Sequence, residues 1–311
     1  MTLLGHHHVT AIASDAQRNR NFYVDILGLR LVKVTVNFDD PTAYHLYYGD
    51  GVGTPGTILT FFIWKGAFAG RAGLGGATAA AFSIPQASLG YWVTRLQEKG
   101  LKAVGPIERF GEKFLLLQDP DGMTVELVAD PAERPLNAWE EGPVPPEHAI
   151  RGLHGVTLLE AGYEETADFL TKELGMTKHA EYLGTSRFAF GTKARSFIDL
   201  KCAPEYFAAT MGTGSIHHIA FRTKNDADQK QWHRTLSHHD HNVSPILDRT
   251  YFRSIYFREP GGVLFEIATD APGFTVDEKR EALGGGLKLP EWMETERSAI
   301  EAALPPFPRS A

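Results

Sequence analysis

The second half of this chain repeats the first, and this repeat limits what the chain can fold into. The residues that recur at one constant offset are His7 with His154, Phe22 with Phe169 and Gly28 with Gly175. The residues that recur at a second constant offset are Trp92 with Trp232, Leu96 with Leu236, Pro120 with Pro260 and Glu126 with Glu266. The sequence therefore predicts four units, of which the third copies the first and the fourth copies the second.

The first unit shows which elements each unit contains. A helix is predicted from Ala16 to Ile26, and the Leu27-Gly28 pair that follows is a signal for its end. Three segments rich in β-branched and aromatic residues, with Gly or Pro between them, are predicted strands at residues 29–36, 43–48 and 57–64. Because a histidine-rich strand precedes the helix, the unit is βαβββ, and the fold class is α+β.

The four units form two tandem pairs, which we expect to be domains at residues 1–130 and 150–270. The segment between them, residues 130–149, is rich in proline, as is typical of a linker. In the tail, residues 271–311, Pro290 is expected to open a helix. The residues that should share the core-facing side of this helix are Trp292, Ala299, Ile300, Ala303 and Leu304.

Composition excludes several classes of partner. The chain has 311 residues, of which 43% are hydrophobic, and a formal net charge of −7. A nucleic-acid partner is not expected, because phosphate binding needs clustered Lys and Arg. The longest apolar run, Ile58 to Trp64, is too short to cross a bilayer, so no membrane association is expected. The single cysteine, Cys202, favours a reducing compartment, and we expect a cytoplasmic protein. The sequence leaves open whether the chain forms a homo-oligomer.

A carboxylate within an apolar strand points to a metal. Gly261-Gly262 predicts a hairpin turn, and the run that follows it would bury Glu266 among hydrophobic residues. A buried charge needs a partner. The candidates are two histidine clusters, His6-His7-His8 and His217-His218, each of which opens a short apolar strand. Histidine and carboxylate together are typical ligands of a divalent metal.

This combination resembles the vicinal-oxygen-chelate (glyoxalase/bleomycin resistance/dioxygenase) superfamily, in which paired βαβββ units curl around a divalent metal. The resemblance implies that each unit offers one ligand position on its first strand and one on its last strand. The first-strand positions are His8, Thr78 or Ala79, Gly155 and His218, in unit order. The last-strand positions are Thr60 (give or take one residue), Glu126, Asp199 and Glu266. Pairing unit one with unit four gives the metal ligands His8, His218 and Glu266. Pairing unit two with unit three gives two carboxylates without histidine, so we expect no working site there and a paired Glu126.

Two histidines and one carboxylate leave coordination positions free, as in non-haem Fe(II) oxygenases. Three alternatives within the superfamily stay open. A glyoxalase-type isomerase would need a second carboxylate where residues 59–61 are Leu, Thr and Phe, and a metal-free resistance protein would lack the histidines. An extradiol catechol dioxygenase would need a histidine where the chain has Gly155.

Local motifs resemble more narrowly the hydroquinone ring-cleaving dioxygenases. They are residues 7–10 (HHVT), 35–41 (TVNFDDP), 44–50 (YHLYYGD) and 254–260 (SIYFREP). The resemblance implies Fe(II), with Mn(II) as a substitute, an aromatic diol and O2 as substrates, and ring opening next to a hydroxyl carbon. It also implies that the residues around the metal are His7, Thr10, His217, Arg249 and Tyr256. Strand alternation predicts Thr10 on the same face as His8, but His7 and His217 on the opposite face.

Overall fold

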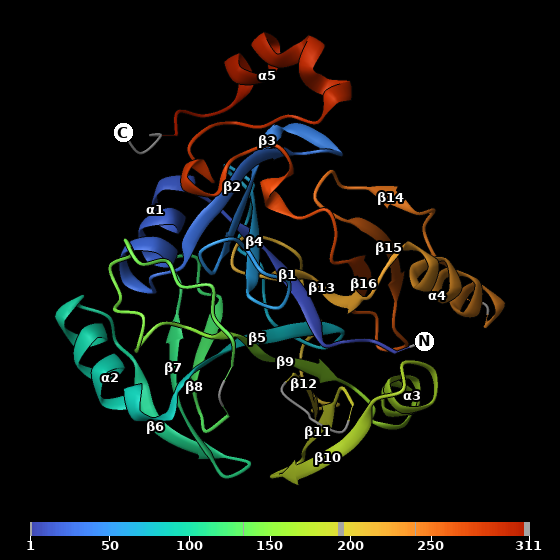
Figure 1. Ribbon diagram of the computed structural model, residues 1–311. Coiled ribbons are helices and arrows are strands. Elements are labelled where there is room, and N and C mark those ends of the chain that lie inside the picture. Colours follow the sequence, from blue (N-terminus) through green and yellow to red (C-terminus); the bar gives the residue numbers. More distant parts are fainter. Residues whose placement is uncertain (1, 133, 192–195, 240, 308–311) are drawn as a thin grey trace.

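A computed structural model describes residues 2–132, 134–191, 196–239 and 241–307. The chain forms two curled eight-stranded sheets, with helices along their outer sides and the C-terminal tail over β2 and β3 (Figure 1). Unit one contains β1 (His6–Ala13), α1 (Ala16–Arg20), the π-helix η1 (Asn21–Ile26), β2 (Arg30–Asn37), β3 (Asp40–Gly49) and β4 (Ile58–Ile63). Unit two contains β5 (Gly76–Pro85), η2 (Gln86–Ser88), α2 (Leu89–Glu98), β6 (Val104–Arg109), β7 (Glu112–Gln118) and β8 (Thr124–Asp130).

The second half has the same plan. Unit three contains β9 (Gly152–Glu160), α3 (Glu164–Asp168), the π-helix η3 (Phe169–Glu173), β10 (Thr177–Tyr182), β11 (Thr185–Ala189) and β12 (Phe197–Cys202). Unit four contains β13 (Ile216–Thr223), α4 (Asp226–His238), β14 (Leu247–Asp248), β15 (Arg253–Arg258) and β16 (Leu264–Thr269). The predicted α+β fold of four βαβββ units is confirmed. Local detail repeats as well, since Gly28 and Gly175 each follow a π-helical turn. Both glycines have a φ of 72°, a backbone conformation that favours glycine.

Each sheet combines a unit from the first half with a unit from the second. One sheet has the order β14-β15-β16-β13-β1-β4-β3-β2, and so joins units one and four. The other has the order β10-β11-β12-β9-β5-β8-β7-β6 and joins units two and three. In both sheets the two first strands of the units lie antiparallel at the centre. Residues 1–130 and 150–270 therefore each contribute strands to both sheets.

Strand register places the four last-strand positions in equivalent places. In each unit, the last-strand position pairs with a residue of the first strand. That residue stands two positions after the first-strand ligand position. The pairs are Thr10 with Thr60, Ala81 with Glu126, Thr157 with Asp199 and Ala220 with Glu266. This register selects Thr60 in unit one and Ala79, rather than Thr78, in unit two.

A β-bulge interrupts the first strand of every unit. In the first sheet, β1 and β13 pair His6 with Phe221 and His8 with Ala220, so His7 is an extra residue. The same strands pair Thr10 with His218 and Ala11 with Ile216, so His217 is extra as well. In the second sheet the extra residues are Thr78 and His154. A bulge turns the side chain of the extra residue out of the strict alternation of a strand.

The tail differs in part from its prediction. Pro290 precedes a 3₁₀ segment, η6 (Glu291–Glu296), and the α-helix α5 (Arg297–Ala303) begins only after it. Ile300 and Leu304 are buried as expected, but Trp292, Ala299 and Ala303 are exposed. The prediction of one amphipathic helix from Pro290 was wrong, because the 3₁₀ segment changes the angle between successive side chains. The rest of the tail, including η4 (Phe274–Val276) and η5 (Arg280–Ala282), lies along the first sheet, where Leu287 bridges to Val34. Among the described residues, no helix is long and apolar enough to cross a membrane.

Candidate metal centre

His8, His218 and Glu266 converge in the first sheet. Their strands, β1, β13 and β16, are adjacent, and all three side chains are buried. His8 Nε2 lies 3.2 Å from His218 Nε2, and Glu266 Oε2 lies 3.4 Å from the former and 3.0 Å from the latter. A metal with bonds of about 2.1 Å to two ligands at right angles separates the ligand atoms by about 3.0 Å. The triangle therefore has the size of one face of a metal coordination sphere.

The two bulge histidines hold the rings of this triangle in place. His7 Nδ1 lies 2.9 Å from His8 Nδ1, and His217 Nδ1 lies 2.8 Å from His218 Nδ1. Burial lowers the pKa of His217 to about 3 and that of His7 well below its usual value, with the neighbouring histidine adding to each shift. Both bulge rings are thus neutral, and each can accept at Nδ1 a hydrogen bond that His8 or His218 donates from Nδ1. His8 and His218 then each direct the lone pair of Nε2 into the triangle, where a cation is needed.

Glu266 has one oxygen satisfied and one free for a cation. The hydroxyl of Ser254 donates to Oε1, whereas Oε2 accepts no hydrogen bond from the described residues. Burial opposes ionisation of this carboxyl, so a positive charge beside Oε2 is needed to keep it ionised. Two lone pairs and one carboxylate oxygen at about 3 Å are the donor set of a divalent metal, and the residues present fit one. Among the described residues, this is the three-residue group whose ligand atoms lie within 4.8 Å of one another.

A cavity of about 320 Å³ opens above the triangle. This volume is near the small end for ligand pockets, roughly 300 to 1,000 Å³, and suits a single-ring molecule. The residues that line it are His8, Asn37, Phe38, Asp39, His45, Tyr47, Phe62, Trp64, His217, His218, Arg249, Phe252, Tyr256 and Leu264. Most of its wall is aromatic, which favours a flat apolar ring as the occupant.

Arg249 and Tyr256 form the polar side of the cavity. Arg249 Nε donates to the Tyr256 hydroxyl at 3.3 Å, and its Nη2 lies 3.2 Å from Oδ2 of Asp39. Burial raises the pKa of Tyr256, so this hydroxyl keeps its proton and can donate it to an oxygen in the cavity. The structure thus brings these two predicted residues beside His218, whose ring lies edge-on to Tyr256.

The structure places the remaining predicted residues, Thr10, His7 and His217, differently from the prediction. Thr10 does not line the cavity, because its hydroxyl is fully buried and bonded to Thr60 Oγ1 at 2.8 Å. The expectation that His7 and His217 point away from the site is wrong. Both are the extra residues of bulges, so His217 lines the cavity and His7 contacts His8 from behind.

Sequence reasoning missed His45 and Tyr47, which lie on the cavity face of β3. The Tyr47 hydroxyl bonds to His45 Nδ1 at 2.9 Å, and His45 Nε2 bonds to Thr60 Oγ1 at 2.8 Å. Burial, and then the nearby His8 and His218, lower the pKa of His45 well below its usual value. Alternation along the predicted strand would have placed both residues on one face, but nothing local showed that this face was the cavity.

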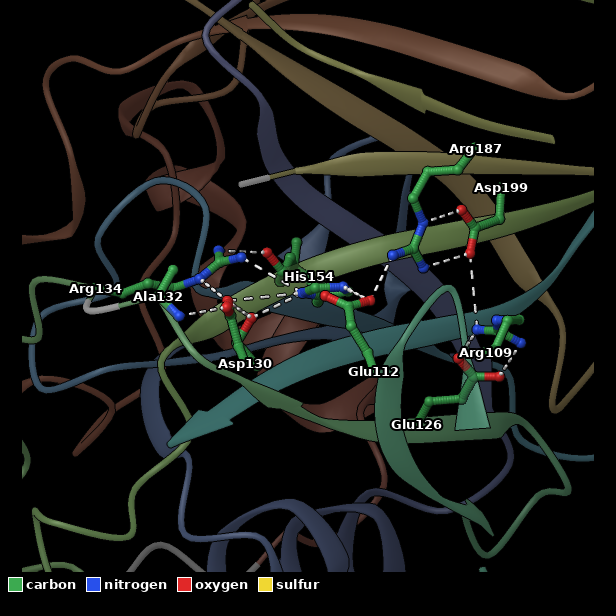
Figure 2. A network of polar contacts seen from close by, with 11 residues as sticks. Arg109, Glu112, Glu126, Asp130, Ala132, Arg134, His154, Arg187 and Asp199 are labelled. Carbon is green, nitrogen blue, oxygen red and sulfur yellow. Dashed lines mark hydrogen bonds and ion pairs between the residues drawn. The ribbon is translucent and has the colours of Figure 1, made fainter. Parts of the chain in front are cut away.

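Two arginines stand where the second sheet would hold a metal (Figure 2). Arg109 donates to Glu126 at 3.1 Å, and Arg187 donates to both oxygens of Asp199 at 2.7 and 2.9 Å. Arg187 also pairs with Glu112, which lies 3.1 Å from His154 Nε2. Glu126 is paired as expected, and its partner is Arg109. The guanidinium groups supply the positive charge that a metal would have supplied.

Comparison with known proteins agrees with this architecture. The sequence profile of the "Glyoxalase/Bleomycin resistance protein/Dioxygenase superfamily" matches residues 5–127 and 152–267. The chain is 43% identical over 304 residues to MhqO of Bacillus subtilis (strain 168), a protein that bears the name of a ring-cleaving dioxygenase, and the match covers 98% of this chain and 96% of that protein. It is 33% identical over 301 residues to the chlorohydroquinone/hydroquinone 1,2-dioxygenase of Sphingobium indicum, covering 93% and 92% of the two chains.

Solved structures extend this likeness to the fold. A crystal structure of a Bacillus subtilis protein, described as a dioxygenase, superposes with a TM-score of 0.95 at 43% identity and 99% coverage of both chains. Glyoxalase I from Zea mays shares the fold alone, with a TM-score of 0.63 at 16% identity over 86% of this chain and 92% of that one. By profile, relatives and fold, the chain belongs to the glyoxalase/bleomycin resistance protein/dioxygenase superfamily.

Proposed function

We propose that this protein is an Fe(II)-dependent dioxygenase that opens the ring of hydroquinone-type aromatics with O2, next to a hydroxyl-bearing carbon. The observation that carries the proposal is the triangle of His8, His218 and Glu266 at the base of an aromatic cavity of single-ring size. The names of the relatives from Bacillus and Sphingobium support ring cleavage and a hydroquinone substrate. Mn(II) fits the same donor set and is a candidate substitute.

Bound iron would supply a Lewis acid with free coordination positions for a substrate oxygen and O2. The chain's own residues then orient the ring. Aromatic side chains such as Phe62, Trp64 and Phe252 cover its faces and keep water away. Arg249 and Tyr256 donate hydrogen bonds to oxygen on the polar side, where negative charge grows during the reaction. Where His217 accepts at Nδ1 from His218, its Nε2 carries the ring proton and is the atom that can donate to a substrate oxygen.

The geometry favours this function over an isomerase. A glyoxalase-type site would need a carboxylate at the last-strand position of unit one, which is Thr60. Its hydroxyl is bonded to both Thr10 and His45 and is fully buried. Unit one therefore contributes one ligand, His8, and no second carboxylate.

An oxygen-electrode assay with one iron-loaded sample tests the proposal. Hydroquinone, catechol and the hemithioacetal of methylglyoxal are compared as substrates. We expect oxygen uptake and a ring-opened product with hydroquinone, and much slower uptake with catechol, because a para-diol offers the metal one oxygen and must be oriented by the pocket. Faster uptake with catechol would indicate an extradiol enzyme, and isomerisation of the hemithioacetal without oxygen uptake would indicate a glyoxalase.

A further inference from the structure

An ion pair crosses the mouth of the cavity. Asp39 lies in the turn between β2 and β3 of unit one, and Arg249 lies just after β14 of unit four. Asp39 Oδ2 and Arg249 Nη2 are 3.2 Å apart, and both residues line the cavity. The Arg249 side chain is 18% exposed, whereas that of Asp39 is 73% exposed. The guanidinium thus belongs to the wall and the carboxylate to the rim.

Arg249 is the charged donor that an anionic substrate would use. Among the described residues that line the cavity, it is the one Lys or Arg. A free guanidinium binds a carboxylate through two parallel hydrogen bonds. Here Nη2 is directed to Asp39 and Nε to Tyr256, so both of these donors are already engaged.

We infer that Asp39 neutralises Arg249 and so restricts the cavity to aromatic diols that carry no carboxylate. This inference rests on the proposed function, and it identifies Asp39 as a specificity-determining residue. A hydroquinone that has lost one hydroxyl proton carries one negative charge, whereas a carboxylated para-diol carries one more. The extra charge would face the carboxylate of Asp39 and would have to displace it from Arg249.

The chain offers a matched control for the charge of Asp39. Asp40 is the next residue, the first of β3, and does not line the cavity. Its carboxylate instead accepts from the backbone and hydroxyl of Thr42. Asp39→Asn and Asp40→Asn therefore remove the same charge one residue apart, and only the first removes it from the cavity. The asparagine keeps the size of the side chain and an oxygen that can still accept from Arg249.

The test is a calorimetric titration of metal-free protein under argon with hydroquinone and with 2,5-dihydroxybenzoate, at low and at high salt. We expect Asp39→Asn to shift the ratio of the two dissociation constants toward the carboxylated ligand by about tenfold, since a full charge is removed beside Arg249. Asp40→Asn should keep the wild-type ratio. The shift should shrink at high salt, because Asp39 is exposed and its field is screened.

The same ratio of kcat/KM values, measured on iron-loaded enzyme, should shift in the same direction. Equal ratios in the two variants, or equal affinity of wild type for both ligands, would overturn the inference. So would an Asp39→Asn variant that loses affinity for both ligands by one common factor, because Asp39 would then only hold the turn in place. If the binding ratio shifts as expected but iron-loaded wild type consumes no oxygen with hydroquinone, the proposed reaction fails and the charge selection stands.

Discussion

At the scale of single residues, the burial of Glu266 explains why the site needs a cation. The side chain is fully buried, and its Oε2 faces two imidazole nitrogens rather than a hydrogen-bond donor. Desolvation of such a carboxylate costs several kcal/mol, which an ion held by all three ligands offsets. Removing any one ligand leaves the other two with an incomplete donor set.

We expect His8→Ala, His218→Ala and Glu266→Ala each to lose the bound metal. Purified wild type should carry about one metal per chain, as measured by elemental analysis after iron loading. Glu126→Gln is the matched control, because Glu126 has the last-strand position of unit two and can keep its contact with Arg109. Metal retained by Glu266→Ala but lost by Glu126→Gln would show that the second sheet holds the site.

Tyr256→Phe should slow ring opening while leaving the metal bound. Loss of one hydrogen bond to an oxygen on which charge develops costs about 2 to 4 kcal/mol in the transition state, or roughly 30- to 1,000-fold in kcat. Tyr23→Phe is a control for the loss of a buried hydroxyl, since Tyr23 donates to Asp119 away from the cavity. An unchanged kcat in Tyr256→Phe would remove this residue from the proposed chemistry.

At the scale of elements, the bulges in β1 and β13 bring pairs of adjacent histidines to one place. In a regular strand, His7 and His8 would face opposite sides of the sheet. The extra residue in each strand instead sets the two Nδ1 atoms within hydrogen-bond distance. A neutral imidazole thereby takes the place that a carboxylate or carbonyl often has behind a metal-bound histidine.

We expect His7→Ala and His217→Ala to weaken metal binding by roughly 10- to 100-fold without abolishing it, as is typical for residues that orient a ligand. Competition with a chelator of known affinity measures the change. His154→Asn is the control, because His154 is the extra residue of the matching bulge in the second sheet. If its metal affinity fell as far as that of His7→Ala, the effect would reflect general destabilisation of bulged strands.

The contact between β9 and the turn after β15 creates a pH-dependent weakness. Glu160 is buried against Gly261, where even a Cβ atom would lie 2.1 Å from its Oε2. Burial, and then the nearby Glu259, raise the pKa of Glu160 to about 8. Between the usual pKa of about 4.5 and 8, the folded state holds a proton that the unfolded state has lost, so stability falls as pH rises through this window.

Glu160→Gln should therefore melt at a higher temperature than wild type at pH 9, with a gain of roughly 2 kcal/mol, and at nearly the same temperature at pH 4.5. Thermal unfolding across this range gives the comparison. Glu164→Gln, which changes an exposed carboxylate nearby, should show no such divergence. A constant difference between Glu160→Gln and wild type at every pH would contradict the assigned cause.

These elements also show what could be predicted from the sequence. The four units followed from internal repetition, because the same residues recur at fixed offsets, whereas their pairing and the expected ligand positions came from the resemblance to the superfamily. The bulges did not, since they arise where β1 meets β13, about two hundred residues later in the chain, and no local pattern marks them. The positions of Arg109 and Arg187 were missed for the same reason, as they meet Glu126 and Asp199 only when the second sheet curls.

At the scale of the whole molecule, two sheets of one plan surround their buried carboxylates with different partners. In the first sheet, Glu266 and two histidines have the arrangement of a metal site. In the second, Glu126 and Asp199 have the equivalent register positions, but β6 and β11 supply Arg109 and Arg187. The guanidinium of Arg187 lies between the rings of Phe110 and Phe197, within 4.1 and 4.5 Å of their centres. The buried carboxylates of both sheets thus lie beside nitrogen groups, which are imidazoles in the first sheet and guanidinium groups in the second.

The second sheet should therefore contribute stability and not metal binding. Arg187→Met leaves Asp199 buried and without its bidentate partner, and it deprives Glu112 of an ion pair. Loss of one partner of a buried pair costs about 3 to 5 kcal/mol, so the variant should unfold at a clearly lower temperature. Its iron content should stay at the wild-type value. Arg253→Met is the control, because its pair with Asp226 is half exposed and should contribute less than about 1 kcal/mol. Loss of iron from Arg187→Met at temperatures where it is still folded would mean that the two sheets are coupled, and that the arginine network acts on the metal centre.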